Sequence, residues 1–268
     1  MKRSAGKKNK NAAPGTDAGA AAETAPKAAR SRRWIGAATM VVAVFVVAGL
    51  VGAVVRDHSA KKLTPPTSGT GPSHLAVPVS GHTPVTLTLY EDLRDPASAT
   101  FEQTYKPALD QLLASGTVKL LYREVAAVDA AKGGTGSLNA ANALGCAQDA
   151  GHFTAYRKVL LANQPAVDTD TFSDKTQLIA LSKQVKKLDT DVFRNCVDSG
   201  AHNVWVKDST SDFASANLGS VPVLTMQVTN QDVAQTVIGG SAQLTPDKLV
   251  AMVINAARTA PSPTPSAS

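Results

Sequence analysis

The sequence predicts an α/β fold with an inserted helical subdomain, preceded by one transmembrane helix. Three observations support this class. A strand, a helix and a second strand follow one another within about 40 residues, over 84–125, which favours parallel pairing of the strands. Residues 137–218 then carry apolar side chains at helical spacing. Two more strands and a last helix complete the order β-α-β, helical insert, β-β-α.

The first 33 residues form a disordered tail, because Ala, Gly and polar side chains cannot bury enough apolar surface to fold. They hold nine basic side chains against two acids, a surplus that exceeds the net charge of +6 of the whole chain. The remainder is therefore close to neutral. The basic composition describes this tail and gives no reason to expect nucleic-acid binding.

Residues 34–56 are expected to span a bilayer. Ile35 to Val55 has no charged residue, and its 21 residues would extend about 31 Å as a helix, which matches the hydrocarbon core. Trp34 suits the interface, and basic residues crowd the N-terminal end. This places the N-terminus in the cytoplasm and the C-terminal domain outside the cytoplasmic membrane. A cleaved signal peptide ending near Val51-Gly52-Ala53 is the alternative, but the long apolar stretch favours an uncleaved signal anchor.

Pro, Gly and Ser are frequent over residues 57–80, which predicts a flexible linker. Residues 260–268 alternate Pro with Ser, Thr and Ala and predict a second disordered tail. Between them, 81–259 is long enough for one domain with a sizeable core.

The first strand of that domain is read from the alternation of apolar and polar side chains over 84–90. Apolar side chains at spacings of three and four then predict a helix that Gly116 ends. Residues 118–125 form a second apolar strand. After the insert, 221–228 and a segment ending at Ile238 predict two strands. Thr245-Pro246 supplies an N-cap and a first-turn proline for the last helix.

This order resembles the thioredoxin fold as elaborated in DsbA-like proteins of the membrane-anchored bacterial envelope type, over about residues 82–258. The segment Leu89-Tyr90-Glu91-Asp92-Leu93 is similar to the family's strand that runs into a C-P-x-C active site at a helix N-terminus. Ser220-Val221-Pro222-Val223 resembles the family's cis-proline loop, which faces that site. The resemblance implies a thioredoxin fold, a cis bond at Pro222 and thiol-disulfide oxidoreductase ancestry.

The C-P-x-C positions of the family fall on Asp95, Pro96, Ala97 and Ser98, so both catalytic sulfurs are missing. Thiol-disulfide exchange needs a thiolate to attack a disulfide, and this degenerate site has none. The segment still suits a helix start, with Asp95 as N-cap, Pro96 at the first position and the Ser98 N–H donating to the Asp95 carboxylate. Ser98 has no neighbouring His or Lys in sequence to act as its base, so no catalytic residue is predicted.

Two interpretations remain open for the surface formed by the Asp95 and Pro222 segments. Asp95 is either a helix cap only, or part of a peptide-binding site with Pro96, Val221 and Pro222. Pro222 is either a kink that defines the fold or the residue that brings strand backbone to the surface, where an extended chain could pair with it.

Cys146 and Cys196, the only cysteines, both fall in the helical insert. An even pair in an oxidising compartment implies a bridge, and apolar neighbours suggest an inert, structural one. Some DsbA-like proteins carry a structural disulfide in this subdomain. Two unpaired core thiols and a redox-active pair are the alternatives.

Other candidate sites are weaker. His152 lies near Cys146, but no set of three or four ligands is apparent, so no metal and no cofactor is predicted. Residues 133–136 are rich in Gly but lack the lysine of a phosphate-binding loop and predict a hinge into the insert. Glu91 and Asp92 are expected to be solvated residues at a strand end, on opposite faces.

The leading hypothesis is a noncatalytic peptide-binding or chaperone-like module, held at the membrane by residues 34–56, with exported or membrane proteins as clients. The rival hypothesis is a thiol-disulfide oxidoreductase acting through Cys146 and Cys196. A scaffold for a single partner protein is the third.

Overall fold

The computed structural model describes residues 63–71, 74–79, 83–229, 233–240 and 242–260. The predicted anchor at 34–56, the predicted tail at 1–33 and residues 261–268 of the second predicted tail lie outside these residues. Within the described part of the chain, no helix combines the length and apolar character that crossing a membrane requires. In order, the elements are β1 (Val77–Pro78), β2 (Val85–Glu91), α2 (Pro96–Ala114), β3 (Val118–Glu124), α3 (Ala127–Lys132), α4 (Gly136–Asp149), α5 (Phe153–Ala162), η2 (Thr171–Ser173), α6 (Lys175–Ser182), α7 (Asp191–Ser199), α8 (Asn203–Ser215), β4 (Val223–Val228), β5 (Gln235–Gly239), β6 (Ala242–Gln243) and α9 (Pro246–Thr259).

The strands form one sheet in the order β1-β3-β2-β4-β5-β6. The central strands β2 and β3 are parallel, from Val85 opposite Val118 to Glu91 opposite Glu124. Strands β4, β5 and β6 continue the sheet antiparallel to their neighbours. The predicted order β-α-β, helical insert, β-β-α is confirmed, with β1 and β6 added as two-residue edge strands.

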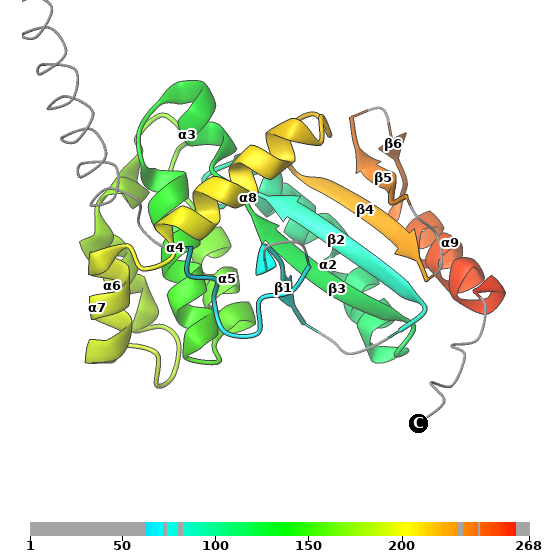
Figure 1. The fold of residues 1–268 in the computed structure, drawn as a ribbon, viewed down its shortest axis with the longest axis horizontal. Coiled ribbons are helices and arrows are strands. Elements are labelled where there is room, and N and C mark those ends of the chain that lie inside the picture. Colours follow the sequence, from blue (N-terminus) through cyan, green and yellow to red (C-terminus); the bar gives the residue numbers. More distant parts are fainter. Residues whose placement is uncertain (1–62, 72–73, 80–82, 230–232, 241, 261–268) are drawn as a thin grey trace, which may run out of the picture. The chain divides into compact units, whose positions relative to one another are not determined.

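Helices cover both faces of the sheet (Figure 1). Leu87 and Leu89 of β2 belong to the main core, together with side chains from α2 and α9. Tyr90 points to the opposite face, since successive strand residues alternate. There it contacts Phe213 of α8, with ring centroids 5.3 Å apart. The sheet is therefore buried on both faces, and the ends of β2 and β3 have helices around them.

The helical insert comprises α3 to α8 and begins about ten residues before the predicted boundary at 137, at α3. Figure 1 shows α3 to α7 grouped beyond the end of β2, whereas α8 runs from them back towards the sheet. Its interior is formed by large apolar side chains from several helices, among them Leu144, Tyr156, Phe172, Leu178, Phe193 and Trp205.

Part of the predicted flexible linker packs against the domain. Leu75, Ala76 and Val77 are buried, and Val77–Pro78 pairs with β3. The indole N–H of Trp205 donates to the carbonyl of His74 over 3.1 Å. The prediction of a flexible linker rested on composition alone. Residues 75–77 are three successive apolar residues, and packing them against the edge of β3 buries apolar surface and covers that edge, which stabilises the docked arrangement of this part of the linker.

Candidate functional site

The N-terminus of α2 is capped by Asp95, as predicted. Asp95 has an extended backbone, and Pro96 occupies the first turn. Its carboxylate accepts from the N–H of Ala97 over 2.9 Å, and not from that of Ser98 as predicted. The N–H of Ser98 donates to the Asp95 backbone carbonyl instead. The observed donor therefore lies one residue before the predicted one. Both backbone N–H groups belong to the first turn, where they lack partners within the helix and can reach the side chain of the N-cap residue.

Ser98 does not face the surface. Its side chain is fully buried, and its hydroxyl accepts a hydrogen bond from the backbone N–H of Asp92 over 3.3 Å. Ser98 therefore ties the helix start to the end of β2, and a substrate has no access to it.

The Val221-Pro222 peptide bond is cis, which confirms the prediction from the resemblance. Gly239, at the end of β5, lies against this loop with φ +116°. A Cβ on Gly239 would lie 3.0 Å from Cγ2 of Val223 and 3.3 Å from the carbonyl oxygen of Pro222. Only glycine allows both this backbone conformation and this approach.

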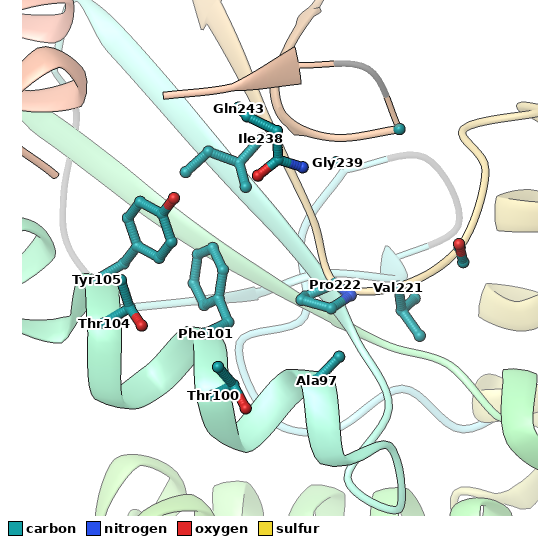
Figure 2. Close-up of a pocket in the computed structure, with 12 residues that line it drawn as sticks. Ala97, Thr100, Phe101, Thr104, Tyr105, Val221, Pro222, Ile238, Gly239 and Gln243 are labelled. Carbon is teal, nitrogen blue, oxygen red and sulfur yellow. The ribbon is translucent and has the colours of Figure 1, made fainter. Parts of the chain in front are cut away.

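A groove of about 340 Å³ separates α2 from the Pro222 loop and the β5–β6 turn. Figure 2 shows the side chains of α2 along one wall, with Pro222, Val221 and Ile238 across from them. Of the four predicted binding residues, Val221 and Pro222 line the groove, whereas Asp95 and Pro96 do not. Two further lining residues, Ala97 and Ser220, belong to the two segments that the resemblance identified. No signal in the sequence pointed to the remaining lining residues, which are Thr100, Phe101, Thr104, Tyr105, Ile238, Gly239, Gly240 and Gln243.

Glu91 and Asp92 are both completely buried, so the expectation of solvated strand-end residues is wrong. The insert supplies the reason, because its helices cover the ends of β2 and β3. Both carboxylate oxygens of Glu91 accept from the guanidinium of Arg157 on α5. A third donor of Arg157 reaches Glu102 of α2 over 2.6 Å. This ion pair therefore joins the sheet, α2 and the insert.

Glu124 adds an acid that has no cation of its own. It is fully buried directly opposite Glu91, and neither of its carboxyl oxygens has a hydrogen-bond donor among the described residues. Burial, together with the negative charge of Glu91, raises the pKa of Glu124 well above its ordinary value. Burial and the neighbouring charge therefore both favour the neutral, protonated form of Glu124.

Asp92 has a different environment from Glu124. Its two oxygens accept from the backbone N–H groups of Arg94 and Val128, each over 2.8 Å. Burial raises its pKa to about 6, although these two hydrogen bonds act in the opposite direction.

Arg94 connects the helix start to the glycine-rich segment predicted to be a hinge. Its guanidinium bonds Asp129, Asp170 and the carbonyl of Gly133, each over 2.9 Å. The same carboxylate of Asp170 accepts from the N–H of Gly136. These contacts hold the α3–α4 connection in one conformation.

Cys146 of α4 and Cys196 of α7 form a disulfide with a Cα–Cα distance of 5.9 Å. The imidazole of His202 lies close by, with a ring nitrogen and both sulfurs within 4.8 Å of one another. The sulfurs are bonded to each other, so this group does not present three free metal ligands. His202 was not singled out in the sequence, because the hydrogen-bond partners of its ring, Thr64 and Asp149, lie 138 and 53 positions away.

Comparison with known proteins agrees with this geometry. The family model described as thioredoxin (Thioredoxin_4) matches residues 80–244. No curated protein matches the chain significantly.

Several solved structures are similar in fold. Oxidised DsbA of Mycobacterium tuberculosis is 24% identical, with a TM-score of 0.54 over 69% of this chain and 94% of that one. Reduced DsbG, a disulfide bond oxidoreductase of the same organism, is 25% identical, with a TM-score of 0.53 over 70% and 94%. Oxidised BdbD of Bacillus subtilis is 19% identical, with a TM-score of 0.55 over 73% and 97%.

Proposed function

The chain belongs to the thioredoxin family, with a DsbA-like fold, and from that premise we propose that it is a noncatalytic peptide-binding or chaperone-like module. The observation that carries the proposal is an open groove beside a helix start that has no sulfur. The positions from Asp95 to Ser98 offer no thiolate, so exchange chemistry has no attacking group there.

The shape and lining of the groove support a peptide ligand. Its volume lies within the range of sites for small ligands, of roughly 300–1,000 Å³. Gly240, which is exposed and has no side chain, brings backbone to the wall, and such backbone can pair with an extended chain. Every lining side chain is uncharged, so the groove suits an uncharged stretch of peptide.

A crosslinking experiment tests this proposal. A photoreactive amino acid is placed at Ala97 in the full-length protein, which is then exposed to a random-sequence peptide library. The matched control carries the same group at Val192 of α7, which is 80% exposed. We expect capture at Ala97 and background labelling at Val192, and a Thr104→Trp substitution that fills the groove should reduce the capture at least tenfold. Equal labelling at both positions would contradict the proposal.

The rival function is thiol-disulfide exchange through Cys146 and Cys196. Family membership favours it, and Cys196 is partly exposed whereas Cys146 is buried. An insulin-reduction assay of the full-length protein, with Cys146→Ser as the negative control, distinguishes thiol-disulfide exchange from a purely noncatalytic binding function. Activity that this substitution abolishes would establish the rival.

We also propose that residues 34–56 anchor the chain in the cytoplasmic membrane with the domain outside, so that its clients are exported or membrane proteins. The uncharged apolar stretch supports this. Protease added to intact cells should digest the C-terminal domain and spare residues 1–33. Protection of the domain would overturn this orientation.

A further inference from the structure

His202 holds a segment of chain that precedes the domain. It lies at the start of α8 with 1% of its surface exposed. Its Nδ1 is 2.8 Å from the backbone carbonyl of Thr64, and its Nε2 is 2.9 Å from a carboxylate oxygen of Asp149. A carbonyl oxygen accepts hydrogen bonds and cannot donate them, and an ionised carboxylate behaves in the same way. Hydrogen on both ring nitrogens, as in an imidazolium, is therefore the arrangement that satisfies both contacts.

Asp149 is the ionised partner in this pair. Burial raises its pKa, but hydrogen bonds from His202 and Thr67 outweigh burial and hold the pKa below its ordinary value. One carboxylate oxygen accepts from the N–H and the hydroxyl of Thr67, over 2.6 and 2.7 Å. The amide of Gln148 donates to the carbonyl of Thr67 over 3.0 Å.

Thr64 and Thr67 are thus fixed at two points, and Pro66 between them is buried. Gly145 of α4 makes room for it, because a Cβ on Gly145 would lie 3.2 Å from Cγ of Pro66 and 2.9 Å from the ring of His202. We call residues 64–67 the docked segment. Its contacts with α4 and α8 form a small binding site within the chain.

We propose that this site is a proton-controlled clamp, in which the docked segment stays bound only while His202 is an imidazolium. Loss of one ring proton leaves a bare nitrogen facing either the Thr64 carbonyl or the Asp149 carboxylate, and two acceptors repel. No other titrating group is bonded to the ring in the described part of the chain. The sulfurs of Cys146 and Cys196 are tied in the disulfide, and Trp205, edge-on at 6.4 Å, is uncharged.

Release would lengthen the chain available before the domain. Residues 75–77 stay buried against β3, so the change concerns the segment before them. Residues 63–69, freed and extended, would span about 23 Å at roughly 3.3 Å per residue. Protonation of one histidine would thus set how far the domain reaches from whatever precedes residue 63.

Hydrogen exchange in the full-length protein tests the clamp, after correction for the intrinsic pH dependence of exchange. Protection of the Thr67 amide should be high at acidic pH and fall roughly tenfold as His202 deprotonates, the effect expected for one lost hydrogen bond. Nitrogen NMR should show both ring nitrogens of His202 protonated in the docked form.

Two variants complete the test. In His202→Gln the Thr67 amide should exchange fast at every pH, whereas His152→Gln, at the start of α5, should behave as the wild type. Asp149→Asn provides an alternative test should His202→Gln fail to fold. It keeps an acceptor for Thr67 but removes the negative charge beside the imidazole, so the docked segment should be released at a lower pH than in the wild type. Protection of Thr67 that does not change between pH 5 and 9, or a single protonated ring nitrogen in the docked form, would overturn the proposal.

Discussion

Glu91 and Glu124 lie directly opposite each other on parallel strands β2 and β3, and only Glu91 is paired with a cation. The guanidinium of Arg157 bonds Glu91 and Glu102, and no described residue bonds the Glu124 carboxyl group. Burial of Glu124 beside the Glu91 carboxylate raises the pKa of Glu124, which favours its neutral form.

The first prediction concerns Glu124→Gln, which mimics the neutral acid. Because the folded state raises the pKa of Glu124, its stabilising effect is complete below about pH 4.5 and is lost as pH rises through the folded pKa. The variant should therefore gain stability relative to wild type as pH increases. Urea denaturation at several pH values measures this, with Asp110→Asn on the surface of α2 as the control. A constant difference across the pH range would contradict it.

Asp92→Asn gives a second pH dependence with a defined window. The folded pKa of Asp92 is about 6 against an ordinary 3.8, so wild type should lose about 3 kcal/mol relative to the variant as pH rises from 4 to above 6. Subtracting the two stability curves isolates this residue from the exposed acids. A flat difference curve would mean that Asp92 is ionised throughout.

Arg157→Met removes the cation and leaves its acidic partners buried. Breaking a buried pair in this way typically costs about 3–5 kcal/mol. Arg194→Met is the matched control, because Arg194 pairs with Asp189 but is 42% exposed, and a loss below about 1 kcal/mol is expected there. Similar losses of unfolding free energy in the two variants would show that burial does not strengthen the Arg157 network.

Replacing both cysteines by serine should destabilise the domain by about 4 kcal/mol, the chain-entropy value for a loop closed over 50 residues. Thermal unfolding with and without dithiothreitol measures it. The reductant should lower the midpoint of the wild type towards that of the double variant and leave the variant unchanged. A wild type as unstable as the variant in the absence of reductant would argue against a stabilising bridge.

Two substitutions of Asp95 distinguish its role as a helix cap from the role of its charge. Asp95→Ala should cost about 1 kcal/mol of stability, since it removes the acceptor for the Ala97 N–H, whereas Asp95→Asn should keep most of the cap. Asp95 does not line the groove, so the Asn variant should bind peptides as tightly as the wild type does. Equal affinities, measured by calorimetry, would assign Asp95 to the cap alone.

Local patterns were sufficient for the elements that depend on neighbours in sequence. The alternation in β2, the N-caps of α2 and α9 and the apolar spacing in the insert each reflect contacts within a few residues. The resemblance also identified the Pro222 loop and the absence of cysteine at Asp95 and Ser98.

The sequence alone thus determined the strand and helix order, the capped start of α2 and the two cysteines available for a bridge. Only the tertiary structure decided that Glu91, Asp92 and Glu124 are buried and that His202 meets Thr64 and Asp149. The physical reason is sequence separation. Burial and hydrogen bonding of these side chains depend on segments that lie about 30 to 140 positions away, and no local pattern encodes which of them will pack together.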